Sequence, residues 1–160
     1  GRFVQKPAEA LTEMKRNLAG KMGGSFITAC ICCLDIRTGR LVSANAGHPP
    51  LIIARRSGAI DVVRSRGRVF LDFLEADYEE AAVSLGAGDK IILYTDGIIE
   101  ARNGDGEMLG EEAFVAMISE NSSLSAGDFC RRMHNDLLNF TGNGRRFEDD
   151  FALLVAEYLG

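Results

Sequence analysis

The run from Lys90 to Asn103 constrains this chain more than any other segment. It begins as a strongly apolar strand, ends at Asp96-Gly97 and continues as a polar segment. A second acidic cluster, Glu148-Asp149-Asp150, stands just before the last apolar run, Phe151–Ala156. Carboxylates are the ligands that hard divalent cations take, provided that the fold brings the two clusters together. The pair of clusters therefore predicts a metal site.

Each motif also has a plain structural explanation. Asp-Gly after a strand is often a turn, because both residues tolerate left-handed conformations, and Asp149-Asp150 can be a solvated strand edge. The metal interpretation rests on the pair, since carboxylates buried at the ends of central strands would be costly without a cation. His48, within Asn45-Ala-Gly-His-Pro-Pro50, either caps a backbone group in a rigid turn or lies at the mouth of a site. The residues alone leave both open.

Length and composition favour a single cytoplasmic domain. The chain has 160 residues, of which 46% are hydrophobic and 26% charged, as in ordinary globular domains. Its net charge of -5 gives no reason to expect nucleic acid or an anionic membrane as a partner. No apolar run approaches the roughly 20 residues that span a bilayer, and no signal-peptide pattern is present. The chain also lacks a serine nucleophile elbow and a Walker phosphate loop.

The four cysteines do not form an evident metal or disulfide motif. On an extended strand Cys30 and Cys32 face one way and Cys33 the other, while Cys130 lies far along the chain. There is no C-x-x-C pair and no nearby histidine to complete a zinc site. We therefore expect buried, reduced thiols rather than a redox pair.

The hydrophobic pattern predicts hairpins followed by helices. A helix is expected over Pro7–Leu18, and a second, with Ser125 as its N-cap, is expected to run through Phe140. A third helical stretch begins at Gly110. The expected strands cover residues 25–35, 41–45, 51–55, 59–63, 78–85, 90–96 and 151–156. Without regular βαβ alternation, this order favours one α+β domain over residues 1–160, with largely antiparallel sheets.

Four segments, in this order, resemble the SpoIIE/RsbU-type bacterial branch of the metal-dependent PPM (type 2C-like) serine/threonine protein phosphatases. They are Phe26-Ile-Thr-Ala29, Asn45-Ala-Gly-His-Pro-Pro50, Tyr94-Thr-Asp-Gly97 with Glu100-Ala-Arg-Asn103, and Asp149-Asp150 with Phe151–Val155. The resemblance runs over essentially the whole chain. NAGHPP followed by YTDG and EARN is far more specific than either acidic motif alone.

The resemblance implies an α-β-β-α sandwich of largely antiparallel sheets flanked by helices. It also implies a centre of two Mn²⁺ or Mg²⁺ ions, at which a metal-bound water attacks a phosphoserine or phosphothreonine phosphorus. By residue matching, Asp96 and Asp149 are the metal ligands. Gly97 and Asp150 support them, and His48 and Asn45 lie near the site. The expected partner is a phosphorylated regulatory protein of the anti-sigma-factor-antagonist type.

The chain also departs from the family pattern. The first family motif, D-x-S-G-H-G, supplies the bridging metal ligand and is absent here, so the chain matches roughly the C-terminal two thirds of a phosphatase domain. Ile99 stands where the family usually has threonine, and Ala152 where a small hydroxyl residue is common. The stretch Phe70-Leu71-Asp72 lacks the usual proline and glycine of its loop. Without the bridging acid, Asp96 and Asp149 are expected to bind one ion weakly, or none.

The sequence therefore predicts the C-terminal portion of a SpoIIE-type phosphatase domain, with weak or no activity in this fragment. The alternative is a degenerate phosphatase fold that serves as a non-catalytic module for protein binding or self-association. Missing N-terminal strands would leave sheet edges uncovered, so we also expect a homodimer.

Overall fold

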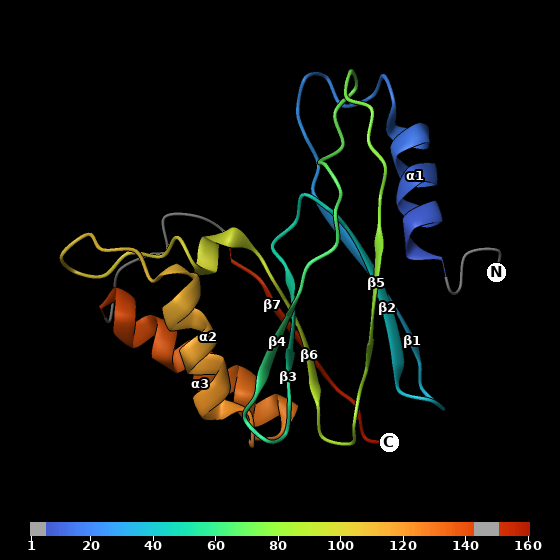
Figure 1. Cartoon of the computed structure of the whole chain (residues 1–160). Coiled ribbons are helices and arrows are strands. Elements are labelled where there is room, and N and C mark those ends of the chain that lie inside the picture. Colours follow the sequence, from blue (N-terminus) through green and yellow to red (C-terminus); the bar gives the residue numbers. More distant parts are fainter. Residues whose placement is uncertain (1–5, 143–150) are drawn as a thin grey trace. The chain divides into compact units, whose positions relative to one another are not determined.

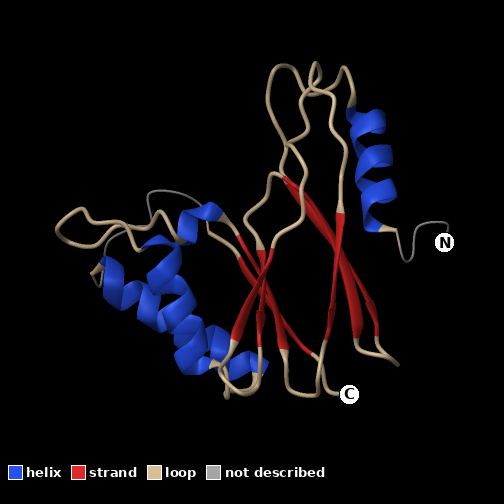
Figure 2. Ribbon diagram, in the orientation of Figure 1, coloured by secondary structure: helices blue, strands red, loops and turns tan. Residues whose placement is uncertain are grey.

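The computed structural model describes residues 6–142 and 151–160 of the chain. Figures 1 and 2 show helices beside antiparallel strands. The elements, in chain order, are α1 (Pro7–Leu18), β1 (Ala29–Asp35), β2 (Arg40–Ala46), β3 (Leu51–Ala54), β4 (Ile60–Val63), β5 (Glu80–Ser84), β6 (Lys90–Tyr94), the 3-10 helix η1 (Asp96–Ile98), α2 (Gly110–Asn121), α3 (Ala126–Thr141) and β7 (Leu153–Glu157). They fall into two compact units, one mainly of residues 1–50 and 63–85 and the other of residues 51–62 and 86–159.

The first unit is a three-stranded antiparallel sheet, in the order β1-β2-β5, with α1 against it. Helix α1 begins with Pro7, whose fixed φ suits the first turn, and Gly20 just beyond its end takes a φ of +72°. Leu11 is fully buried and packs with Ala44, Ala46 and Phe70. This small core holds α1 on the face of the sheet that carries the even-numbered residues of β2.

The second unit is a four-stranded antiparallel sheet, in the order β4-β3-β6-β7, with α2 and α3 packed together beside it. Ile92 lies opposite both Ile52 and Val155, so the three side chains share one face of the sheet. The helices cover that face with a row of fully buried side chains: Phe114, Ile118, Phe129, Met133 and Leu137. This core holds β6 as an inner strand of the sheet, and the Asp96-Gly97 segment directly follows that strand.

Most of the expected helices and strands are confirmed. The predicted α+β class with antiparallel sheets is confirmed as well. Helix α1 has the predicted bounds, and Ser125 is the N-cap of α3. The strand expected over residues 25–35 is shorter, because β1 begins only at Ala29. Before that strand, Ile27 makes an isolated bridge to Phe70. Among the described helices, none is both long enough and apolar enough to cross a membrane.

The N-cap of α3 gives a first testable prediction. Ser125 Oγ accepts a hydrogen bond from the Asp128 backbone N–H at 3.2 Å, which satisfies one of the free donors of the first turn. We expect Ser125→Ala to lower the free energy of unfolding by about 1 kcal/mol, measured by urea denaturation. Ser123→Ala, an exposed serine outside the cap, is the control and should change stability by less than about 0.5 kcal/mol.

Candidate functional site

Asp96 lies just after the end of β6, one of the two inner strands of the sheet in the second unit. Tyr94 is buried at the end of β6, and the chain then enters η1, in which Gly97 and Ile98 are buried. The Asp96 side chain, by contrast, is exposed. The expectation that this carboxylate would be buried is therefore wrong. The chain turns the Asp96 side chain outward at η1, while the next two residues, Gly97 and Ile98, lie in the interior. The φ of Gly97 is not positive, so the glycine does not form a left-handed turn here.

The pairing of β6 with β7 extends to the residue before Asp96. Tyr94 pairs with Leu153, and the pairing continues one step beyond the strands. The Thr95 backbone N–H donates to the Ala152 carbonyl at 3.1 Å, and the Ala152 N–H donates to Thr95 Oγ1 at 2.8 Å. Asp96 thus follows a residue that is bonded to Ala152, which stands only two positions after Asp150 in the sequence. Asp149 and Asp150 themselves lie outside the described residues.

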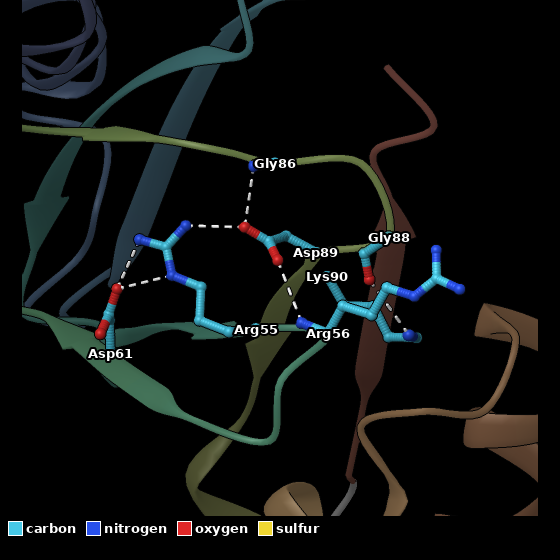
Figure 3. Close-up of polar contacts among 7 residues, drawn as sticks. All are labelled: Arg55, Arg56, Asp61, Gly86, Gly88, Asp89 and Lys90. Carbon is cyan, nitrogen blue, oxygen red and sulfur yellow. Dashed lines mark hydrogen bonds and ion pairs between the residues drawn. The ribbon is translucent and has the colours of Figure 1, made fainter.

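A second aspartate at the opposite end of β6 has the reverse environment (Figure 3). The Asp89 side chain is only 8% exposed and forms an ion pair with Arg55 at 2.7 Å. It also accepts hydrogen bonds from the backbone N–H groups of Arg56 and Gly86, at 3.0 and 2.9 Å. For the Asp96 carboxylate, no hydrogen bond or ion pair to any other described residue is present. Of these two acids, Asp96 is the one left free to bind a cation.

Lys90, next to Asp89, is also buried but has a structural role. Its side chain is 1% exposed, and Nζ donates to the Ser122 carbonyl at 2.8 Å. Ser122 is the C-cap residue of α2, so the ammonium group lies at the negative end of the helix dipole. Together Asp89 and Lys90 hold the start of β6 to the β3–β4 hairpin and to α2.

The Asp89 contacts give a prediction about pH. Burial by itself would raise the pKa of Asp89, but hydrogen bonds from Gly86, Arg55 and Arg56 outweigh it, so the pKa lies below the ordinary value of 3.8. A carboxylate with a depressed pKa in the folded state stabilises the fold above its unfolded pKa, and this stabilisation is lost as pH falls. We expect the free energy of unfolding to fall below about pH 4, and to fall less steeply in Asp89→Asn. Urea denaturation across pH 3–6 measures both slopes, and equal slopes would contradict the assignment.

Asn45 and His48 are brought together at the end of β2, in the first unit. The buried Asn45 side chain accepts from the His48 backbone N–H at 2.8 Å and donates to the His48 carbonyl at 2.8 Å. Gly47 takes a φ of +69°, and a Cβ atom there would lie 2.3 Å from Val69 Cγ1. Nδ1 of the half-buried His48 lies 3.3 Å from Thr28 Oγ1. The Asn45 side chain thus caps the backbone of this turn.

The predicted site residues are therefore found in different parts of the fold. Asp96 and Gly97 belong to the second unit, whereas Asn45 and His48 belong to the first. Within residues 6–142 and 151–160, no three or more His, Cys, Asp or Glu side chains form a group that could hold a metal ion. The assignment of His48 and Asn45 to the neighbourhood of Asp96 stays a prediction.

Two residues that position β6 are not among the predicted site residues. At its end, the Thr95 hydroxyl and N–H both bond to Ala152. At its start lies Asp89, and the signal that could have found it is the Gly-Ala-Gly-Asp89 sequence directly before an apolar strand. His134 is exposed, and its ring stacks on Phe151 with centroids 6.4 Å apart.

Comparison with known proteins gives consistent results. The family model described as Stage II sporulation protein E (SpoIIE) matches residues 4–159. Phosphoserine phosphatase RsbU of Bacillus subtilis is 25% identical over 151 residues, which cover 93% of this chain and 44% of RsbU. The fold resembles that of the SiaA-PP2C domain of Pseudomonas aeruginosa, with a TM-score of 0.83 and 21% identity, over 95% of this chain and 61% of that one.

A second solved structure gives a similar result. It contains the RsbU and RsbW domains of Rv1364c from Mycobacterium tuberculosis, and it has a TM-score of 0.78 and 28% identity over 95% of this chain and 42% of that one. The chain thus spans less than half of the length of RsbU. The predicted fold and the predicted branch of phosphatases are both confirmed.

Proposed function

Because the chain belongs to the SpoIIE family, whose model matches residues 4–159, we propose that it is the C-terminal portion of a metal-dependent protein serine/threonine phosphatase domain. The observation that carries the proposal is the Thr95–Ala152 pairing. It ties the residue before Asp96 to the segment that directly follows the second acidic motif. The second acidic motif itself stands two positions before Ala152 in the sequence, 53 residues after Asp96 when counted to Asp149.

The donor chemistry of Asp96 fits a hard divalent cation. Its carboxylate is exposed, and it stands where a rigid, buried strand holds its backbone in place. Asp96, together with Asp149 and with support from Gly97 and Asp150, would hold Mn²⁺ or Mg²⁺, which are cations that prefer oxygen ligands. When bound, such ions supply Lewis acidity and activate a water molecule for attack on phosphorus. Thr95 contributes by fixing the two strand ends relative to each other.

The name of one relative supports a substrate class for this chain. RsbU is named a phosphoserine phosphatase, and we propose phosphoserine or phosphothreonine on a regulatory protein, of the anti-sigma-factor-antagonist type, for this chain. We also propose that the protein acts in the cytoplasm.

The test is Mn²⁺-dependent hydrolysis of p-nitrophenyl phosphate by the purified chain, followed by release of phosphate from phosphoserine and phosphotyrosine peptides of equal sequence. Turnover that requires Mn²⁺ and prefers the phosphoserine peptide supports the proposal. Turnover that does not require Mn²⁺, or that is equal on the two peptides, would contradict it.

A non-catalytic binding module is the second candidate. It is favoured by the observation that the described residues hold no group of three metal-ligating side chains. Self-association belongs to this candidate as well, since β1 and β7 are outer strands of their sheets in the described part of the chain and Leu154 is 56% exposed. A strictly monomeric sedimentation profile would refute self-association. Metal-dependent turnover that is lost on substitution of Asp96 would refute the inert module.

A further inference from the structure

Two of the four cysteines lie side by side on one face of an outer strand. Cys30 pairs with Asn45 and Cys32 with Ser43, so both thiols project from the same side of β1. Strand β1 has only one neighbour, β2, in the described sheet. Both thiols are free and half-buried, rather than buried as the sequence predicted. A small polar oxidant therefore has access to them.

The two thiols differ in their readiness to ionise. A hydrogen bond donated by Cys32 to the Cys30 sulfur lowers the pKa of Cys30 below its ordinary value. The same hydrogen bond, and then burial, raise the pKa of Cys32. Cys33 projects from the opposite face, where burial and the negative charge of Glu80 raise its pKa. Because the thiolate is the reactive form, Cys30 is the most nucleophilic of the three.

A metal site does not account for the pair. Thiolate sites for zinc need four ligands, and no third His, Cys, Asp or Glu joins these two among residues 6–142 and 151–160. A thiolate-prone cysteine beside a second thiol is instead the arrangement found in redox-active cysteine pairs.

We propose that Cys30 and Cys32 form an oxidisable thiol pair whose substrate is a hydroperoxide, with Cys30 as the nucleophile and Cys32 as the resolving thiol. The Cys30 sulfur attacks one peroxide oxygen, an S–O bond forms, the O–O bond breaks, and the leaving hydroxide takes the proton that Cys30 released. The Cys32 sulfur then displaces hydroxide from the Cys30 sulfenic acid, and its thiol proton completes a second water. Two thiols and one hydrogen peroxide thus give one disulfide and two waters.

The strand must contract for the second step. Residues i and i+2 of a strand have Cα atoms about 6.7 Å apart, which is at the long end of the range of about 4.4–6.8 Å found for disulfides. An outer strand can shorten at this point more easily than a central one, because only β2 resists. Cys30 lies opposite Asn45, whose side chain holds the turn at His48. Oxidation therefore loosens that turn.

The experiment treats the reduced full chain with hydrogen peroxide and analyses the tryptic peptide of residues 22–37, which contains the three clustered cysteines. We expect a mass loss of about 2 Da, located between Cys30 and Cys32. In Cys32→Ser, a sulfenic-acid probe such as dimedone should label Cys30 at least about tenfold faster than Cys130. Cys33→Ser is the matched control and should still lose 2 Da.

Several outcomes would overturn the proposal. Oxidation to sulfinic acid without disulfide, a disulfide that requires Cys33, or equal labelling of Cys30 and Cys130 would each do so. Amide hydrogen exchange tests the coupling. The amides of residues 45–48 should exchange faster after oxidation of the wild type, and their exchange should stay unchanged when Cys32→Ser is treated in the same way. Unaltered exchange in an oxidised wild-type chain would refute the coupling. None of these readouts depends on phosphatase activity.

Discussion

Replacing Asp96 by asparagine is expected to lower Mn²⁺-dependent hydrolysis of p-nitrophenyl phosphate by about 100-fold or more. Asparagine keeps the size and one oxygen of the side chain but removes its negative charge, and that charge is the property a hard cation requires. The substitution should leave the fold intact, because the side chain is exposed. The free energy of unfolding is expected to change by less than about 0.5 kcal/mol.

Asp105→Asn is the matched control for Asp96. This aspartate is also exposed and lies nine residues later in the loop before α2, so its loss changes the net charge by the same amount. Its activity should stay within about twofold of the wild type. Equal activity of Asp96→Asn and the wild type, in a chain that hydrolyses the substrate, would show that Asp96 does not hold the metal. A Mn²⁺ titration of both variants separates loss of binding from loss of turnover.

Removing the carboxylate of Asp89 is expected to have the largest effect on stability. Asp89→Ala removes one carboxylate partner of the half-buried Arg55 guanidinium and leaves the Gly86 and Arg56 N–H groups without this acceptor. Breaking a buried ion pair on one side costs about 3–5 kcal/mol, and the partial exposure of Arg55 places this case near the lower figure. Urea denaturation at pH 7 measures the loss.

Asp61→Ala provides the comparison within the same network. Asp61 binds the same guanidinium at 2.5 Å, but its side chain is 47% exposed. Exposed ion pairs contribute about 0–1 kcal/mol, so this variant should be destabilised much less than Asp89→Ala. Equal losses in the two variants would mean that the burial of Asp89 is not what makes it important. Figure 3 shows both carboxylates bound to the same guanidinium.

The fold could be predicted largely because local patterns agreed with it. Pro7 and Gly20 mark the ends of α1, Ser125 marks the start of α3, and β6 is a short apolar run between two turns. The bounds of the strands could be predicted less well than those of the helices, because a strand ends where its pairing with a neighbouring strand ends. Residues 25–28 have β-forming side chains, yet the regular pairing with β2 stops at Ala29. Pairing of this kind cannot be derived from a single segment.

The sequence by itself determined the family, the antiparallel α+β class and Asp96 as a candidate metal ligand, because these follow from short motifs in a fixed order. Only the tertiary structure decided which of the two aspartates that flank β6 has a carboxylate without a partner among the described residues. Asp89 and Asp96 flank the same strand, and nothing local distinguishes a buried aspartate from an exposed one. The register of β3 against β6 brings Arg55 within reach of Asp89, while η1 turns Asp96 toward solvent. Whether a carboxylate is neutralised depends on which side chain the neighbouring strand brings next to it. That neighbour comes from a segment that is distant in the sequence.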